Sequence, residues 1–378
     1  MMSPDGKPDI QPRRLERLLK ALVDIYSPSG KEEELLEFTE DYLKKVGLKI
    51  VRQEVDDDRA NLIVLPGGKE DTAEIELCFV GHVDTVAAYE LEDYQSRKEG
   101  DTIFGLGTAD MKAGCAAMIE AFTVLSGYPD TFPPVGLALV VDEEEDNKGA
   151  KALVEEYSFP WAVVGEPTNL EPCLGHYGYL EVLLRTQGKQ AHSAMPERGQ
   201  NAIEHMLKLL LEVIRYFTSG SPGLVYNIRE LTGFPSGFVV PAICEAYLDL
   251  HLPPESSIDV LKTELEQVVR ASRDAIPGLD AILRFEEAYS GYRISAERPM
   301  VGKLSEVYRQ MALPWEPQSF RSHSDGNILW TAGVDPIILG PGRLEAAHAQ
   351  GESVSFAQVV QAARLYLNLA LSLKGTED

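Results

Sequence analysis

Acidic residues and histidines follow the apolar runs of this sequence at several places. Three predicted strands end in such residues: His82 and Asp84 follow residues 74–80, the stretch Asp142, Glu143, Glu144 and Glu145 closes residues 136–142, and Glu166 follows residues 161–164. Two further motifs hold the same residue types: Asp110 lies in GLGTADMKAG, and His348 and Glu352 follow the run at 334–340. In open α/β sheets, ligands bind beyond the carboxyl ends of the strands. We therefore expect these side chains to converge on one crevice.

The residue types in this group predict a site for metal ions. So many carboxylates in one crevice would repel one another strongly unless a cation neutralised them. Imidazole and carboxylate ligands without thiolate suit zinc, and also cobalt or manganese. Two histidines and three carboxylates suffice for two ions if one carboxylate bridges them. Asp84 could hold the second ring nitrogen of His82. In the pair Glu143–Glu144, one carboxylate could bind a metal while the other serves as a general base.

Strands alternating with helices are expected to position these residues. Helical apolar spacing occurs at residues 13–27, 31–47, 113–125 and 148–157, and Ser29 could cap the second of these helices. With the strands, this spacing predicts an α/β sheet with helices on both faces. The middle of the chain instead predicts strands at 177–188, 245–252 and 281–288 and helices at about 200–217 and 256–274. This order indicates a compact α+β module inserted between two parts of the α/β domain.

The composition excludes several classes of partner. The 378 residues include 35 Lys and Arg against 60 Asp and Glu, a net charge of -25, which repels phosphate backbones and anionic lipids. We therefore expect no nucleic acid and no membrane as partners. No run is long and apolar enough to span a membrane, and the N-terminus lacks the apolar core of a secretory signal, so the cytoplasm is the expected compartment. Four scattered cysteines, Cys78, Cys115, Cys173 and Cys244, favour buried reduced thiols over a disulfide framework.

Six motifs resemble those of one enzyme family. GHVDTV, GLGTADMKAG, VVDEEEDNKGA, GEPT, GKQAHSAMPERGQNA and the GPG…AH…E segment are similar to motifs of the zinc aminoacylase and carboxypeptidase family. That family includes acetylornithine deacetylase, succinyl-diaminopimelate desuccinylase, aminoacylase-1, peptidase T and glutamate carboxypeptidase. The resemblance implies a zinc-peptidase-like α/β/α catalytic domain, formed by residues 1–175 and 293–378, with an inserted ferredoxin-like α+β dimerisation or lid domain at 176–292. It also implies a homodimer.

The same resemblance implies a cofactor of two zinc ions. His82 and Glu166 would bind one ion, and Glu144 and His348 would bind the other. Asp110 and a water or hydroxide would bridge the two ions. A cis peptide bond is expected between Asp110 and Met111, as in relatives.

Three further residues receive catalytic roles from the resemblance. Asp84 would orient His82, and Glu143 would act as general base and then protonate the leaving amine. His192, in QAHSAMP, would reach the active site of the neighbouring subunit and steady the tetrahedral oxyanion. For Glu352, the sequence leaves open whether it begins a helix or supports a metal ligand.

The sequence departs from the family where substrate is bound. Phe238 stands where many relatives have Asn, and His251 stands where many have an Arg that pairs with the substrate carboxylate. Histidine does not replace arginine in bidentate carboxylate binding. Other residues could line the substrate pocket instead: the cations Arg198, Arg321 and Arg343, and His323, Asp325 and Asn327 of SHSDGN, a motif that resembles the peptidase T and glutamate carboxypeptidase branches.

Several functions therefore remain open. The first is a deacylase that removes an acetyl or succinyl group from an amino acid, and the second is a dipeptidase, tripeptidase or carboxypeptidase with the same chemistry. A non-catalytic binding protein would be expected to lack Asp110, Glu143 or a ligand, and all are present. A hydrolase with a single metal ion or a metal other than zinc is a further alternative. The expected partner is a small N-acyl amino acid or a short peptide.

Overall fold

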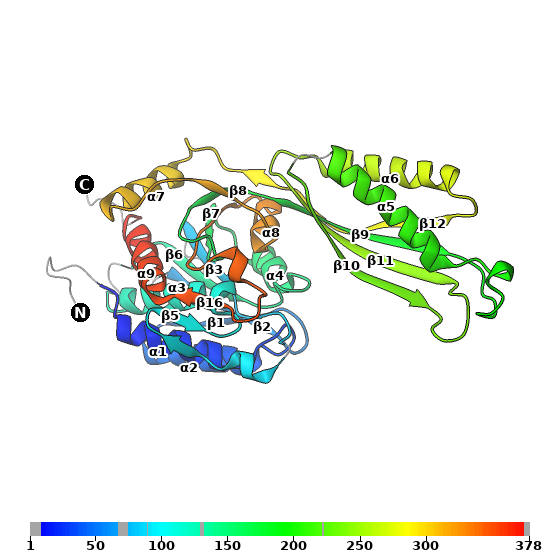
Figure 1. Ribbon diagram of the computed structural model, residues 1–378. Helices are drawn as coiled ribbons and strands as arrows, with labels where there is room; N and C mark the ends of the chain where they lie inside the picture. Colours follow the sequence, from blue (N-terminus) through cyan, green and yellow to red (C-terminus); the bar gives the residue numbers. More distant parts are fainter. Residues whose placement is uncertain (1–8, 67–74, 89, 129–131, 221–222, 374–378) are drawn as a thin grey trace. The chain divides into compact units, whose positions relative to one another are not determined.

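The protein consists of two compact units. The computed structural model describes residues 9–66, 75–88, 90–128, 132–220 and 223–373 (Figure 1). The first unit comprises the residues up to 174, together with 294–320 and those from 324 on, and the second comprises 175–293 and 321–323. The largest sheet lies mainly in the first unit, and the second unit has a sheet and a buried core of its own. The two units are described separately below.

Four parallel strands form the middle of the sheet in the first unit. In spatial order they are β6 (Val135–Val140), β3 (Leu77–His82), β7 (Trp161–Val164) and β15 (Asp335–Ile338). All their residues are buried, which is typical of parallel strands covered on both faces. Antiparallel strands continue the sheet at both edges. Beyond β6 lie β2 (Ala60–Val64) and then β1 (Val51–Glu54). Beyond β15 lies β8 (Cys173–His176), which also pairs with β14 (Gln318–Phe320). The last two residues of β8 belong to the second unit, where they pair with β13 (Tyr292–Arg293).

Two groups of helices cover opposite faces of this sheet. Consecutive side chains of a strand point to opposite faces, and Phe79 and Val80 of β3 distinguish the two groups. The ring of Phe79 lies 5.9 Å from Phe122 and 5.5 Å from Tyr366, whereas Val80 shares a core cluster with Leu153 and Leu329. Helices α3 (Ala113–Leu125) and α9 (Phe356–Leu371) lie on the Phe79 side. Both contact α1 (Pro12–Asp24), and α9 also contacts α7 (Pro299–Gln310). Helices α4 (Lys148–Glu156) and α8 (Asp325–Thr331) lie on the Val80 side.

A small second sheet in the first unit ties two distant segments together. It consists of β16 (Ser353–Ser355), β5 (Thr102–Phe104) and β4 (Arg97–Glu99), all antiparallel. Helix α2 (Glu33–Lys45) contacts β2 of the main sheet.

The second unit is a four-stranded antiparallel sheet with two helices on one face. Its strands follow the order β10 (Val225–Phe234), β11 (Ile243–Leu252), β9 (Gly178–Gln187) and β12 (Asp280–Tyr289). Helices α5 (Ala202–Gly220) and α6 (Ile258–Ala275) lie side by side over this sheet (Figure 1). Every second residue of β11 is buried in the core that the helices share with the strands, as expected for a sheet with one face covered.

These observations confirm the predicted fold class, an α/β/α unit with an inserted ferredoxin-like α+β unit. One strand of the insert was not predicted: β10 has no fully buried residue, because it is an edge strand whose side chains remain partly or fully exposed. The run expected from residue 74 forms a strand only from Leu77, and Glu74 lies outside the described residues. Within the described part of the chain, no helix is long and apolar enough to cross a membrane.

The prediction that Ser29 caps a helix is wrong. Helix α2 begins at Glu33, its N-cap residue is Glu32, and no side chain caps it. The Ser29 hydroxyl instead donates a hydrogen bond of 2.7 Å to Asp84 Oδ2. Hydroxyl groups that could cap a helix bond other acceptors when the fold brings a carboxylate close.

Two glycines allow helix α3 to approach the end of strand β7. A Cβ atom added to Gly114 would lie 2.2 Å from the carbonyl oxygen of Gly165, far inside van der Waals contact. Gly165 directly precedes Glu166. The absence of a side chain on Gly114 therefore helps to set the position of the backbone that carries Glu166.

We predict that Gly114→Ala lowers the free energy of unfolding by about 1–3 kcal/mol, the usual cost of overpacking a rigid interior. Gly302→Ala is the matched control, because Gly302 is also helical and a Cβ there would meet no atom within 4 Å. This control should be neutral or stabilising by up to about 1 kcal/mol. Urea unfolding measures both. Equal stabilities for the two variants would contradict the packing argument.

Candidate metal centre

Five separate segments of the first unit bring the predicted metal ligands together. His82 is the last residue of β3, Glu144 follows β6, and Glu166 follows β7. Asp110 lies in an irregular helical turn, Thr108–Lys112, and its peptide bond to Met111 is cis, as predicted. His348 lies between β15 and β16. The edge of the sheet at which parallel strands end thus carries most of the group.

Asp110 lies between two sets of candidate ligands. Its Oδ1 atom is 3.1 Å from Nε2 of His82, and its Oδ2 atom is 3.5 Å from Nε2 of His348. The ligand atoms of His82, Asp110 and Glu166 lie within 4.8 Å of one another, and so do those of Asp110, Glu144 and His348. A carboxylate shared by two sets is the arrangement that the sequence predicted for the bridge. That these residues bind metal stays a prediction.

Glu143 adjoins the first set. Its Oε2 atom lies 3.8 Å from His82 Nε2, and its ligand atom lies within 4.8 Å of those of His82 and Glu144. Burial raises its pKa well above the usual carboxyl range, and the nearby carboxylates of Glu166 and Glu144 add to this effect. A largely buried carboxylate that stands outside the two ligand sets around Asp110 is suited to proton transfer.

The carboxylates of the group outnumber its histidines, and most of these side chains are buried, whereas that of His348 is half exposed. Burial raises the pKa of Glu166 well above its usual range, and the carboxylate of Asp110 adds to the shift. Burial opposes a charged ring at both histidines, but neighbouring carboxylates outweigh it: they raise the pKa of His82 well above its usual range and that of His348 to about 9. Proximity of like charges and burial both make a carboxylate retain its proton. Cations placed among these side chains would reverse the shifts of the carboxylates.

One unpartnered atom shows that the residues fit a metal ion. Oε1 of Glu166 is buried and has no hydrogen-bond partner among the described residues, and it lies 3.7 Å from His82 Nε2. A buried carboxylate oxygen without a partner is costly, and a cation between Glu166, His82 and Asp110 would satisfy it. Imidazole and carboxylate donors suit zinc, cobalt and manganese alike.

Asp84 connects the two halves of the site. Oδ1 accepts a hydrogen bond from the backbone N–H of Glu143 at 3.2 Å, and Oδ2 accepts one from Glu144 at 3.1 Å and one from the Ser29 hydroxyl. His82 Nδ1 lies 3.1 Å from the backbone oxygen of Asp84 and 3.5 Å from its carboxylate. The main chain of Asp84 is thus the nearer acceptor for His82, while its carboxylate holds the Glu143–Glu144 backbone. Sequence spacing could not reveal this second contact.

A second network holds the turn that carries Glu143 and Glu144. Asp142 has a positive φ of 68°, and its carboxylate forms an ion pair with Arg59. The backbone oxygen of Asp142 accepts a hydrogen bond of 2.6 Å from the backbone N–H of Asn147. Asn147 Nδ2 donates to the Glu143 carbonyl at 3.4 Å and to Asp325 Oδ1 at 3.0 Å. Neither Arg59 nor Asn147 was predicted to belong to the site. Arg59 lies far from the candidate ligands in sequence, and although Asn147 stands in the motif VVDEEEDNKGA, the motif does not reveal its contact with Asp325.

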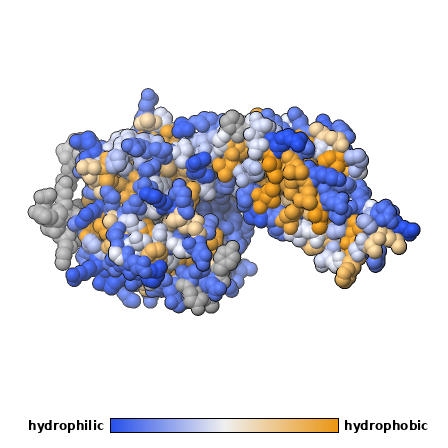
Figure 2. Space-filling view, viewed as in Figure 1, coloured by the Kyte–Doolittle hydropathy of each residue, from blue (hydrophilic) through white to orange (hydrophobic). Residues whose placement is uncertain are grey.

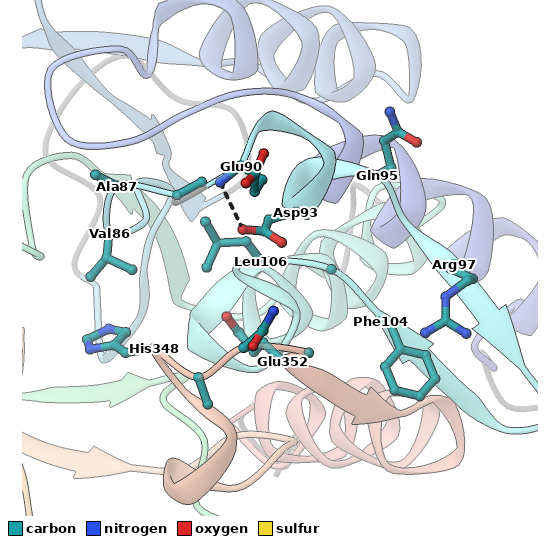
Figure 3. A pocket seen from close by; sticks show the side chains of 15 residues that line it. Val86, Ala87, Glu90, Asp93, Gln95, Arg97, Phe104, Leu106, His348 and Glu352 are labelled. Atoms are coloured by element: carbon teal, nitrogen blue, oxygen red, sulfur yellow. Dashed lines mark hydrogen bonds between the residues drawn. The ribbon is translucent and has the colours of Figure 1, made fainter.

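A pocket of about 560 Å³ opens beside His348 (Figure 3). Three segments of the first unit line it, namely residues between 86 and 97, residues 104–106 and residues 348–352. Its polar side chains include Glu90, Asp93 and Arg97, and its apolar ones include Val86 and Leu106. This pocket offers room for a small organic molecule next to the candidate ligands.

The other predicted residues are not part of this cluster. Four lie in the second unit: His192, Arg198 and Arg321 are exposed, and the ring of His323 is stacked between Tyr179 and Tyr289 at 5.1 and 4.9 Å. In the first unit, Asp325 and Asn327 are fully buried and Arg343 is exposed. The Asn327 side chain accepts from the backbone of Ser324 as part of a helix cap. Substrate binding by these residues stays a prediction.

Comparisons with known proteins place the chain in a family. Residues 78–372 match the model of the peptidase family M20/M25/M40. An acetylornithine deacetylase from Aliivibrio salmonicida is 27% identical over 331 residues, which cover 83% of this chain and 85% of the relative. One from Vibrio cholerae is 27% identical over 340 residues, which cover 86% and 87%.

Solved structures show the same fold. A tripeptidase from Staphylococcus aureus has a TM-score of 0.78 at 22% identity, covering 97% of this chain and 100% of that one. A dinuclear metal-binding peptidase of the M20 family from Bacillus subtilis has a TM-score of 0.69 at 12% identity, covering 96% and 98%. Since the family model spans most of the chain, this protein belongs to peptidase family M20/M25/M40 and is a metal-binding hydrolase that acts on amide bonds.

Proposed function

We propose that the protein is a two-metal deacylase that releases an amino acid from a small N-acyl amino acid. The observation that carries the proposal is the place of Asp110, whose two oxygens face His82 and His348 while Glu143 adjoins the same group. The sequence relatives that cover most of the chain are acetylornithine deacetylases, which supports the acyl amino acid as substrate. The expected cytoplasmic location stays a prediction.

The ligand set divides between two positions. His82 and Glu166 would hold one ion, Glu144 and His348 would hold the other, and Asp110 would contact both. When bound, the ions would polarise the scissile carbonyl and lower the pKa of a coordinated water. Zinc is the expected metal, and cobalt or manganese would suit the same donors.

Glu143 would carry the proton during the reaction. A general base works best when its pKa lies near the working pH. Burial raises the pKa of Glu143, and nearby cations would lower it again, which would bring the carboxylate toward that range. Glu143 would accept a proton from the attacking water and deliver it to the departing nitrogen. Asp84 would keep Glu143 in place through its hydrogen bond from the Glu143 backbone.

His192 would stabilise the oxyanion of the tetrahedral intermediate. Its Nδ1 atom accepts a hydrogen bond from the backbone N–H of Ala194 at 3.1 Å, so the neutral ring carries its proton on Nε2. His192 is exposed, and an Nε2–H group is a suitable donor to a developing negative charge. We propose that it serves the active site of a second copy of the chain, as the family resemblance implies.

A second candidate function is peptide hydrolysis. The SHSDGN segment is similar to the peptidase T branch, and the fold of a tripeptidase covers nearly the whole chain. The same catalytic groups would cleave either bond. The two functions differ only in what the substrate presents on the acyl side.

The second unit offers a surface for the proposed homodimer. Leu207 and Leu211 of α5 are 49% and 61% exposed, and apolar side chains gather over α5 in Figure 2. Val225, Leu231 and Phe234 of the edge strand β10 are also exposed. An edge strand with apolar side chains beside an apolar helix is a surface that a second copy could cover by continuing the sheet.

A substrate screen tests the proposed function. Hydrolysis of N-acetyl and N-succinyl amino acids should be compared with that of dipeptides and tripeptides, with zinc, cobalt or manganese added. We expect the highest kcat/KM for an N-acyl amino acid. Faster cleavage of peptides would favour the second candidate, and no hydrolysis of either class would overturn the proposal.

Glu143→Ala should retain both metal equivalents while kcat falls by about 10²–10⁴-fold, because only proton transfer is lost. Elemental analysis and steady-state kinetics measure the two effects. Glu145→Ala is the control, since Glu145 is the exposed neighbour in the same turn and should leave kcat within about twofold of the wild type. Near-normal turnover by Glu143→Ala would refute the role of this residue.

Leu211→Glu should shift a dimer toward monomer, because a charge at the centre of an apolar contact would be buried without a partner. Sedimentation velocity at several concentrations measures this shift. Val260→Glu, a change at a similarly exposed site on α6, should leave the distribution unchanged. A wild-type protein that is monomeric at all concentrations would contradict the proposed dimer.

A further inference from the structure

The carboxylate of Glu352 is used entirely by the backbone that leads to Asp110. Glu352 is 3% exposed. Its Oε1 atom accepts hydrogen bonds from the backbone N–H groups of Ala109 at 2.7 Å and Asp110 at 3.0 Å, and its Oε2 atom accepts one from Gly107 at 2.9 Å. Three backbone donors of one turn therefore share a single side chain about 240 residues away in sequence. Glu352 does not begin a helix, which removes one of the two roles that the sequence left open.

The main chain adds a fourth contact between the same two segments. Gly105 N donates to the backbone oxygen of Glu352 at 3.0 Å. Directly beyond it, Ser353 of β16 pairs with Phe104 of β5. The turn that leads to Asp110 and the segment that carries His348 thus leave the ends of two paired strands, and Glu352 stands at that junction.

Each segment provides one candidate ligand to the same metal position. Asp110 Oδ2 lies 3.5 Å from His348 Nε2. Asp110 lies in the irregular turn Thr108–Lys112, and His348 lies in the connection between β15 and β16. A loop position is set less firmly than a position on a strand or helix. Glu352 stands four residues after His348 in sequence and accepts the hydrogen bond of the Asp110 amide. It can therefore fix the separation of the two segments without a hydrogen bond to either ligand side chain.

We propose that Glu352 is a positioning residue that holds the backbone of Asp110 at the correct distance from His348 and so sets the geometry of the shared carboxylate. The proposal rests on the proposed two-metal function. A carboxylate suits this role because hydrogen bonds from backbone N–H groups to an ionised acceptor are short and strong. Removing it would leave three buried donors without an acceptor, and residues that orient metal ligands in this way affect metal affinity strongly.

Glu352→Gln tests the proposal, because the amide keeps the shape of the side chain but offers only one acceptor oxygen. In the metal-free protein, we expect faster hydrogen exchange of the amides at residues 107–110. Calorimetric titration with cobalt should show a loss of about 10–100-fold in the affinity of at least one ion. Glu352→Asp, which keeps the charge but shortens the reach, should be affected in the same direction and provides a second variant if the glutamine protein does not fold.

The control is Glu120→Gln. Glu120 is also a buried carboxylate that accepts a backbone hydrogen bond, from Gln11 N at 2.7 Å, and it pairs with Arg14 rather than with the Asp110 turn. This variant should lose stability but bind both cobalt ions within about twofold of the wild-type affinity. Wild-type exchange and affinity in both Glu352 variants, or an equal loss of affinity in Glu120→Gln, would overturn the positioning role while leaving the two-metal function intact. A wild-type protein that binds no cobalt would overturn both.

Discussion

The site depends on one carboxylate that is shared by two imidazole–carboxylate groups. Asp110 faces His82 with one oxygen and His348 with the other, and further buried carboxylates surround this trio. Without positive charge among them, burial and mutual repulsion raise the pKa of Glu143 and Glu166. The same imbalance that makes the group unfavourable by itself would favour the binding of cations, since a divalent ion is the largest local charge that such a site can take up.

Holding these side chains together requires donors behind them. Backbone N–H groups and one hydroxyl donate to the carboxylates of Asp84 and Glu352, and neither carboxylate belongs to the candidate ligand sets. Asp84 fixes the turn of Glu143 and Glu144, and Glu352 fixes the turn of Asp110. Two acids thus act through the backbone of other residues. The close approach of Gly114 to Gly165 shows the same dependence of ligand position on the packing behind it.

Much of the first unit could be predicted from the sequence, because its central strands are continuous apolar runs and three of them are followed directly by acids or a histidine. His82, Glu144 and Glu166 were predictable for that reason, and Asp110 and His348 from their motifs. The edge strand β10 was not, since it has no fully buried residue. Ser29 was assigned to the wrong partner because a hydroxyl before a helix looks like a cap until the fold brings Asp84 within 2.7 Å. Arg59 reaches Asp142 and Asn147 reaches Asp325 across long sequence separations, which local spacing cannot show.

The central claim is that two cations share Asp110. Anomalous diffraction from crystals of the cobalt-loaded protein, recorded on both sides of the cobalt absorption edge, tests it most directly. The account predicts two peaks in the first unit, about 3.5–4 Å apart, one beside His82 and Glu166 and the other beside Glu144 and His348, with Asp110 between them. A single peak, or peaks away from Asp110, would contradict it.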